Sequence, residues 1–203
     1  MRTIDLKKDL KPYYSQRRGV VSIIDVPAFA FLMVDGHGDP NGSPAFAAAC
    51  EVLFSLSYTL KFMLKMDKRT YDYPVMPLEG LWWTKDMAQF SLDRKDLWDW
   101  TVMILQPDII TPGLHAEAVE KLKKKKPQLA TGDARLGRFA EGTCAQILHV
   151  GPFSTEGPTV QKLHDHIAEE GRSLRGKHHE IYFSDPRRAD PSKMKTIIRQ
   201  PIV

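Results

Sequence analysis

Apolar residues follow two patterns along the chain, short β-rich runs and longer helical stripes. The run AFAFLMVDG at 28–36 is almost entirely apolar, which is typical of a central strand. A loop rich in Gly, Asp, Pro and Asn follows, and Ser43 and Pro44 then suit the N-cap and first position of a helix. This helix is predicted to run to about residue 65, with a core stripe formed by Leu53, Leu56, Leu60 and Leu64.

Two strands are predicted after this helix, at 75–84 and 97–107, with a polar turn between them. The segment 111–126 then has the pattern of a second helix, because Thr111 suits the N-cap and a proline follows it. Three apolar residues of that helix are expected to point inward: Ala116, Val119 and Leu122.

The second half of the chain repeats this plan. A strand is predicted at 143–151 and a helix at 159–171, which Gly171 ends in the C-cap position. Strands at 178–185 and 193–202 follow. Both halves thus have the order strand, Gly/Pro loop, helix, strand, strand, which indicates an internal duplication of a βαββ unit.

Two βαββ repeats predict an α+β fold, in which an antiparallel-rich sheet has its helices on one face. We expect a single domain over 1–203, with repeat one at about 20–107 and repeat two at about 141–203. Linker helices are expected between them, at about 108–140. Seams between such units are where clefts form, so a ligand cleft is predicted between the repeats.

Composition fits a globular protein, with 203 residues of which 42% are hydrophobic and 27% charged. No apolar run approaches the roughly 20 residues that span a bilayer, and the charged N-terminus has no apolar segment of a secretory signal. We therefore expect a cytoplasmic protein and no membrane partner. Cys50 and Cys144 are expected to be free buried thiols.

The formal charge of +4 owes much to one lysine-rich run, Lys121–Pro127. A solvated helix end explains the run better than a nucleic-acid site, so nucleic acid is not an expected partner. No metal is expected either, because His164 and His166 are two apart on a helix and share no face. The sequence also contains no phosphate-binding glycine motif, and no cofactor is predicted.

Several phrases of the sequence resemble one known family. The C-terminal HHEIYFSDPRRADPSKMKTIIRQPI is similar to the ending of the GyrI-like small-molecule-binding domains. The phrases IDLKKDLKPYY, VPAFAFLMVDGHGDPN, SYTLKF and PLEGLWW are similar to a stand-alone branch of that family, the cyclopropanoid cyclopropyl hydrolases. The resemblance extends over nearly the whole chain, and because this sequence shows no helix-turn-helix ahead of the domain, the transcription-factor form of the family is not expected.

This resemblance implies a duplicated βαββ fold with an aromatic-lined ligand cleft between its halves. It also implies a glutamate as the polar contact, at the position of Glu180. The stand-alone branch is associated with hydrolysis of cyclopropane-bearing DNA-alkylating compounds, whereas other GyrI-like members bind ligands without chemistry. Hydrolysis and sequestration are therefore both expected classes of function, and an interaction with topoisomerase or nucleic acid is a third.

Strand alternation adds detail at HHEIYFSD. Glu180 and Tyr182 share one face with His178, and the more apolar set of His179, Ile181 and Phe183 shares the other. The apolar set is the natural core face, which aims Glu180 into solvent or into the cleft. A carboxylate among aromatic rings loses hydration and can act as a general acid or base near neutral pH.

The adjacent Trp82 and Trp83 must point to opposite faces of their strand. One is expected in the core and the other in the cleft, the alternative being that both are core or surface cover. Glu79 shares the side of Trp83, which suggests the wetter face and favours Trp83 as the cleft residue. Glu79 itself is a secondary ligand-binding candidate.

The first helix is expected to form a further wall through Phe54, Tyr58 and Lys61, which lie at i, i+4 and i+7 beside the leucine stripe. Tyr58 is the second catalytic candidate, because its hydroxyl would polarise a ligand carbonyl while Glu180 activates water. Trp100 and Tyr73 complete the ligand-binding candidates. The expected partner is a flat hydrophobic or cationic xenobiotic, and a homodimer is left open.

Overall fold

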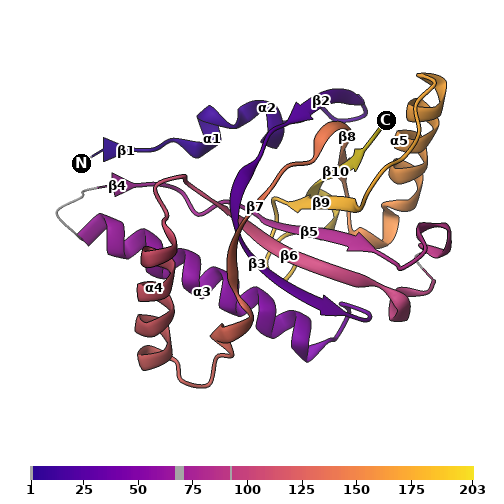
Figure 1. Ribbon diagram of the computed structural model, residues 1–203. Helices are drawn as coiled ribbons and strands as arrows, with labels where there is room; N and C mark the ends of the chain where they lie inside the picture. Colours follow the sequence, from indigo (N-terminus) through magenta and orange to yellow (C-terminus); the bar gives the residue numbers. More distant parts are fainter. Residues whose placement is uncertain (1, 67–70, 92) are drawn as a thin grey trace. The chain divides into compact units, whose positions relative to one another are not determined.

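The computed structural model describes residues 2–66, 71–91 and 93–203 (Figure 1). The chain divides into two compact units. The first unit comprises Met1–Asp9, Phe29–Met76 and Trp82–Phe139, and the second comprises Leu10–Ala28, Pro77–Leu81 and Ala140–Val203.

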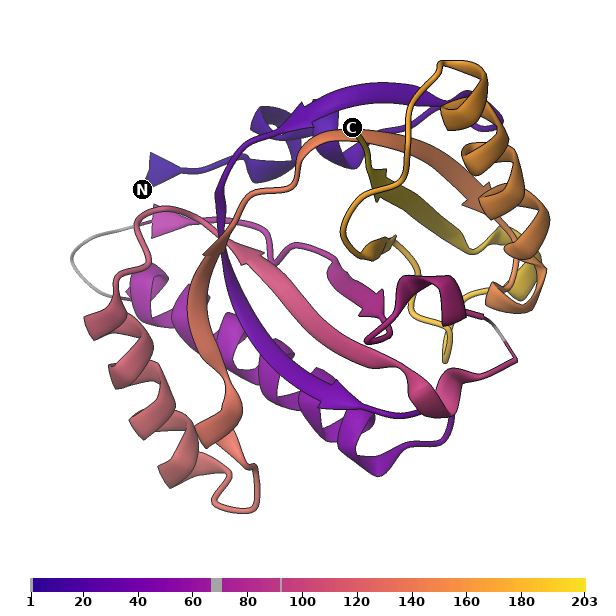
Figure 2. The same cartoon turned by 45° about the vertical axis from the view of Figure 1, so that its right-hand side comes forward.

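The first unit is built on three main strands and two helices. Its main elements are β3 (Phe29–His37), α3 (Pro44–Met66), β6 (Asp99–Gln106), α4 (Pro112–Lys125) and β7 (Arg135–Phe139). Strand β3 pairs antiparallel with both β6 and β7, and α3 packs against β3, β6 and α4 (Figure 2). Smaller elements are β1 (Arg2–Thr3), which pairs parallel with β4 (Tyr71–Asp72), α1 (Leu6–Asp9), and 3-10 turns at Met87–Gln89, Lys95–Leu97 and Thr131–Asp133.

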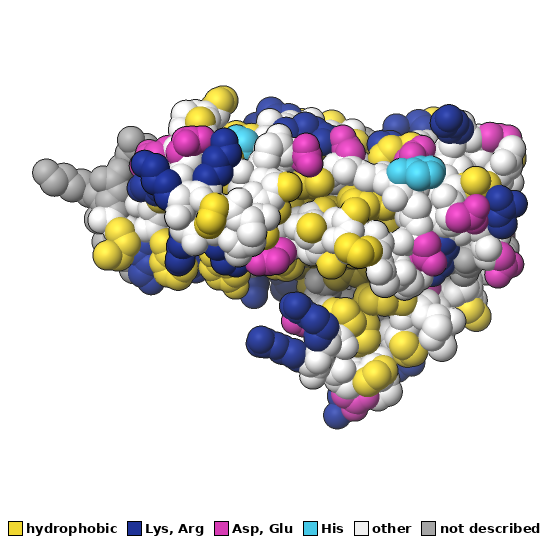
Figure 3. Space-filling model, turned by 90° about the horizontal axis from the view of Figure 1, so that it is seen from below, with side chains coloured by type: hydrophobic (Ala, Val, Ile, Leu, Met, Phe, Trp, Pro, Cys, Tyr) yellow, Lys and Arg dark blue, Asp and Glu magenta, His cyan; other side chains and the backbone are white. Residues whose placement is uncertain are grey.

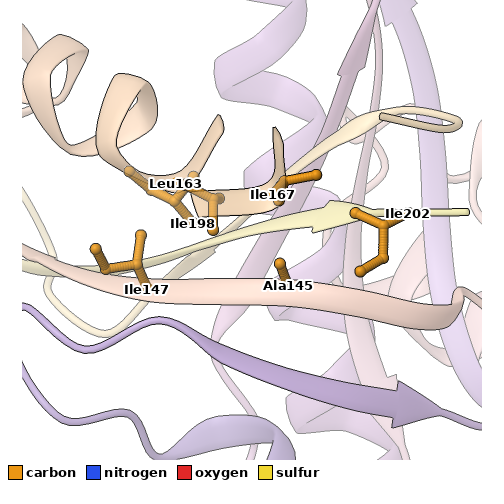
Figure 4. Packing of buried hydrophobic residues seen from close by; sticks show 6 residues of the cluster. All are labelled: Ala145, Ile147, Leu163, Ile167, Ile198 and Ile202. Carbon is orange, nitrogen blue, oxygen red and sulfur yellow. The ribbon is translucent and has the colours of Figure 1, made fainter. Parts of the chain in front are cut away.

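The second unit has the strand order β2-β8-β10-β9. Its elements are α2 (Lys11–Tyr14), β2 (Ser22–Val26), β8 (Gly142–Val150), α5 (Gly157–Glu169), β9 (His178–Tyr182) and β10 (Lys195–Pro201), with 3-10 turns at Phe153–Thr155 and Pro191–Lys193. Helix α5 covers one sheet face, and the core between them comprises Ala145, Ile147, Leu163, Ile167, Ile198 and Ile202 (Figure 4).

The remaining strand, β5 (Leu78–Trp83), contributes residues to both units. The order β3-α3-β5-β6 then matches the order β8-α5-β9-β10, which confirms the predicted βαββ repeat and the antiparallel α+β class. Strands β2 and β7 were not predicted. Each one precedes one repeat in sequence but pairs with the first strand of the other, β2 with β8 and β7 with β3. The segment expected to hold linker helices therefore contains one helix, α4, followed by β7.

The predicted helix ends are confirmed at three places. The Ser43 and Thr111 hydroxyl oxygens accept hydrogen bonds from the amides of Phe46 and Leu114, at 3.3 and 3.2 Å. Gly171 follows α5 with a φ of +68°, in the left-handed region that favours glycine.

The leucine stripe of α3 is buried as predicted, whereas the inward face of α4 was placed wrongly. Leu122 is buried, but Ala116 is exposed and Val119 is half-buried. The buried stripe is instead Leu114, Ala118 and Leu122, at the i, i+4, i+8 spacing that the two larger leucines select.

Helix α3 is long and apolar enough to cross a membrane by length and composition, with a mean hydropathy of 1.3 over an 18-residue window. The sequence reading, which found no apolar run of that length, missed this property. The leucine stripe packs α3 on β3 and β6, so its hydropathy is that of a core helix in an α+β unit.

A close contact in the first unit generates a prediction. Gly36 lies opposite Trp100 in the β3–β6 pair, and a Cβ built on Gly36 would come within 2.1 Å of the indole ring. The ring is rigid, 1% exposed, and packed edge-on against Phe46 at 5.3 Å. Gly36→Ala should therefore lower the free energy of unfolding by about 1–3 kcal/mol, measured by urea denaturation with tryptophan fluorescence.

Gly132→Ala is the matched control, because a Cβ at Gly132 meets nothing within 4 Å. Equal stability of the two variants would show that the packing of Trp100 does not require a glycine at position 36.

Candidate functional site

Strand β9 presents two chemically different faces within the second unit. Its register with β10 pairs Glu180 with Ile198 and His179 with Arg199. Ile198 belongs to the core under α5, so Glu180 lies on the α5 face and His179 on the opposite face. The prediction that the two residues point to opposite faces is confirmed. The α5 face is a core face as well, since Ile198 packs there with Leu163 and Ile167.

Glu180 is held by its neighbours two residues away on the same strand. The hydroxyl of Tyr182 donates to Oε2 at 2.8 Å, and Nε2 of His178 lies 3.0 Å from Oε1. The His178 and Glu180 side chains are 7% and 15% exposed. The phenol ring of Tyr182 meets the ring of Phe153 edge-on, with the centroids 5.5 Å apart. Glu180 is thus a shielded carboxylate with two hydrogen-bonding ring partners and an aromatic border.

The loop that carries Phe153 is fixed by His149 at the end of β8. Nδ1 of His149 lies 2.9 Å from the Thr159 hydroxyl, and Nε2 lies 3.3 Å from the Pro152 carbonyl oxygen. Gly151 has a φ of +145°, and a Cβ there would come within 3.1 Å of the imidazole. A glycine is therefore needed for the chain to turn this closely around His149.

A buried ionic cluster occupies the opposite face of β9. The two ring nitrogens of His179 each meet a carboxylate, Glu141 Oε1 at 2.9 Å and Glu79 Oε2 at 3.1 Å. Arg199 Nη1 donates to the second oxygen of Glu141 at 2.9 Å. All four side chains are at most 2% exposed. Two negative and two positive groups make this cluster neutral when His179 is protonated.

The same cluster fastens the N-terminal segment of the second unit. The hydroxyl of Tyr14 donates to Glu79 Oε1 at 2.5 Å, and Arg199 Nη2 donates to the backbone oxygen of Tyr13 at 2.5 Å. Arg199 Nε also donates to Oε1 of Gln146 at 3.1 Å. Polar bonds to buried charges therefore hold residues 13–14.

Burial and charge oppose each other in the pKa values of the cluster. Burial would lower the pKa of His179, but Glu141 and Glu79 outweigh it and raise the pKa to about 9. Burial would likewise raise the pKa of Glu141, but His179 and Arg199 hold it at about 2. Burial and the neighbouring Glu79 raise the pKa of Tyr14 well above its ordinary range. At neutral pH His179 is therefore an imidazolium.

Glu79 lies where the sequence did not predict it. It was expected on a wetter face, but its side chain is 0% exposed and bonded to Tyr14 and His179. Alternation along β5 puts Trp83 on the same strand face as Glu79, and Trp82 on the other. Trp82 is buried against Phe46 and Trp98, with ring centroids at 5.8 and 5.5 Å, while Trp83 is half-buried.

The other candidates of the first unit do not form one cluster. Tyr58 is 48% exposed and stacks on Phe62 at 6.3 Å, and Phe54 is half-buried. Lys61 donates to the backbone oxygen of Tyr73 at 2.7 Å and pairs with Asp72 at 3.2 Å. Tyr73 and Trp100 are buried. Lys61 and Tyr73 are thus brought together through the backbone, apart from the Tyr58 ring pair.

Sequence reasoning missed most of the buried cluster. Tyr14, Glu141 and Arg199 come from three distant segments, and each looks like an ordinary surface residue in its local pattern. The only local signal is His179 itself, a titratable residue among the apolar positions of a strand. Such a residue requires a partner when it is buried.

Within residues 2–66, 71–91 and 93–203, no group of three His, Cys, Asp or Glu residues is placed so that it could hold a metal ion. The lysine run is largely paired with acids, since Lys121 contacts Glu117 at 2.8 Å and Lys123 contacts Glu120 at 3.0 Å. Lys126 contacts Glu51 at 3.0 Å.

Comparison with known proteins identifies relatives of the whole chain. The family model of the GyrI-like small molecule binding domain matches residues 20–202. An uncharacterized conserved protein from Listeria innocua is 44% identical with a TM-score of 0.91, and the match covers 98% of this chain and 100% of that one. A protein from Listeria innocua described as a hydrolase is 43% identical with a TM-score of 0.88, and the match covers 100% of both chains.

The C-terminal domain of EcmrR is similar to this chain in fold only. It is 10% identical with a TM-score of 0.58, and the match covers 91% of this chain and 97% of that one. No curated protein matches the chain.

The buried cluster predicts a large cost for removing its central cation. His179→Ala leaves Glu79 and Glu141 buried without their shared partner, so the free energy of unfolding should fall by about 3–5 kcal/mol in urea denaturation. His166→Ala is the control, because His166 is half-buried on α5 and should change stability by less than about 1 kcal/mol. Similar losses in the two variants would contradict the role of the cluster.

The raised pKa of His179 predicts the pH dependence of stability. A group whose folded pKa of about 9 exceeds its ordinary 6.5 stabilises the fold fully below pH 6.5 and loses this contribution as the pH rises through 9. Stability should therefore fall between these values, by up to about 1.4 kcal/mol per pH unit. Thermal unfolding of wild type and His179→Gln across this range measures the effect. A wild-type profile as flat as that of the variant would contradict it.

Proposed function

The chain belongs to the GyrI-like small-molecule-binding family, and we propose that it binds a flat hydrophobic or cationic xenobiotic beside Glu180 and hydrolyses cyclopropane-bearing alkylators. The small-molecule class follows from the family match, which covers residues 20–202. Hydrolysis is supported by the hydrolase description of the Listeria innocua relative at 43% identity. The choice of substrate rests on the resemblance of the sequence to the stand-alone branch.

One observation carries the proposal, namely a shielded carboxylate with an aromatic border. Glu180 is half-buried, both its oxygens accept from ring residues, and Phe153 stands edge-on against Tyr182. A flat cation would gain from the negative charge and from the ring faces. A carboxylate fixed in this way can also take a proton from a water molecule that attacks a bound electrophile.

The proposed reaction is an addition of water across one cyclopropane bond. The water oxygen bonds to a ring carbon, the carbon–carbon bond breaks, and its electron pair passes to a carbonyl oxygen conjugated with the ring. Glu180 takes the proton that water loses, and the product oxygen gains one, so the net change is one molecule of water. The sequence assigns the carbonyl contact to Tyr58, and this assignment stays a prediction.

The remaining aromatic candidates differ in how well their positions support a role in ligand binding. Trp83 was the preferred cleft residue, but it shares its strand face with Glu79, whose partner His179 points away from Glu180. This alternation weighs against Trp83. Trp82 lies on the other face of β5 within a cluster of rings. Tyr182 is the ligand-binding candidate with the most direct support, through its bond to Glu180.

Sequestration is the second candidate function. The same shielded carboxylate and rings would bind a ligand without chemistry, and this is favoured by the family description, which names binding alone.

Nucleic-acid binding has less support. Lys121, Lys123 and Lys126 of the basic run pair with acids, and Figure 3 shows basic and acidic side chains interspersed on the face in view. A mixed surface of this kind lacks the one-sign field that draws a phosphate backbone. A cytoplasmic location and a homodimer are further proposals.

Turnover distinguishes hydrolysis from sequestration. The protein is incubated with a cyclopropapyrroloindole alkylator, and the ring-opened, hydrated product is followed by mass spectrometry. We expect many product molecules per protein molecule for the wild type and at least a roughly 100-fold lower rate for Glu180→Gln, because the amide cannot accept the proton. Glu169→Gln, an exposed change on α5, should retain the wild-type rate.

Stoichiometric retention of intact alkylator would contradict hydrolysis and favour sequestration. Turnover that survives Glu180→Gln unchanged would show that another group activates the water.

A further inference from the structure

We propose that His178 is a positioning residue for Glu180, which fixes the orientation of the carboxylate and thereby sets how strongly the site prefers a cationic ligand. This inference rests on the proposed binding function of the Glu180 site and adds a residue to it. It starts from the hydrogen bond between His178 Nε2 and Glu180 Oε1, at 3.0 Å.

Three side chains of β9 together fix the direction of the Glu180 carboxylate. His178, Glu180 and Tyr182 lie at i−2, i and i+2 of β9, so the pleat of the strand sets all three on one face. Tyr182 donates to one carboxylate oxygen at 2.8 Å and His178 contacts the other at 3.0 Å. Two partners on two different oxygens remove the rotation that a carboxylate with one partner retains. The charge of Glu180 therefore points in one direction.

Glu180 is the one acidic group among these three side chains, and its neighbours offer a phenol O–H and an imidazole N–H. A second histidine, His164, lies on α5. Burial, and after it the charge of the neighbouring His178, lowers the pKa of His164.

Helix α5 and strand β10 supply the neighbours of this face of β9. Within the part of the chain that the structure describes, Nε2 of His164 is buried and has no hydrogen-bond partner. From β10, the residues paired with Glu180 and Tyr182 are Ile198 and Thr196, neither of which carries a charge. These two positions of β10 thus place no cation beside the carboxylate.

The test compares ligands that differ in charge and share a ring system. Binding of ethidium, a flat cation, and of neutral 6-phenylphenanthridine is measured by fluorescence titration at pH 8. His178→Leu removes the donor, while His178→Gln keeps a neutral N–H that can reach the carboxylate. His166→Leu is the matched control, because it removes another histidine, one that lines the outer groove of α5.

We expect His178→Leu to weaken ethidium binding about tenfold and to change the binding of the neutral ligand by less than about twofold. His178→Gln should restore most of the preference, and His166→Leu should leave it intact. A merely structural role would weaken both ligands together and would lower the melting temperature in proportion. In the Glu180→Gln background, His178→Leu should have no further effect on the preference, because the carboxylate it positions is absent.

The outcomes separate this inference from the function on which it rests. If the wild type binds neither probe, the proposed binding site fails. If the wild type prefers ethidium and His178→Leu keeps that preference, the binding site stands and the positioning role of His178 is overturned.

Discussion

The buried cluster of Glu79, His179, Glu141 and Arg199 is the interaction on which the second unit depends. It joins β5, β9 and β10 to the chain ahead of β8, and through Tyr14 and Arg199 it holds the N-terminal segment. Charges this deeply buried are tolerated only when every member has its partner. The cluster also sets the register of β9. A slip of one residue would move His179 out of the cluster and would bring the carboxylate of Glu180 next to those of Glu79 and Glu141. The buried cluster thus determines where Glu180 points.

The parts of the fold that depend on local pattern were predictable. The leucine stripe of α3, the caps at Ser43 and Thr111 and the order of both repeats follow from spacing within single segments. Strands β2 and β7 were missed because each is short, only partly apolar, and stabilised by pairing with a strand of the other repeat. In α4 the choice among apolar positions depended on the neighbour that the helix packs against, which periodicity does not specify.

In the candidate site, too, the features that depend on local pattern were predictable and those that depend on long-range contacts were not. Alternation within β9 was enough to group Glu180 with Tyr182 and to separate both from His179. The burial of Glu79 was not accessible in this way, because it depends on Tyr14, 65 positions away, and on His179, 100 positions away. A carboxylate followed by two tryptophans gives no sign of partners so distant. Its assignment to a wetter face was a reasonable local inference that long-range hydrogen bonds overrule.

One strand therefore carries two tasks, on two faces. The odd-numbered side of β9 supplies the cation of a closed, fully paired cluster, and the even-numbered side supplies a carboxylate held by two ring partners. Because neighbouring residues of a strand share one backbone, the hydrogen bonds that hold His179 also hold the backbone that carries Glu180. A carboxylate set on a flexible loop would lose part of its binding energy in becoming ordered. Glu180 stands one residue from His179, whose two ring nitrogens both meet carboxylates, so the proposed ligand contact is carried by a backbone that the cluster already holds in place.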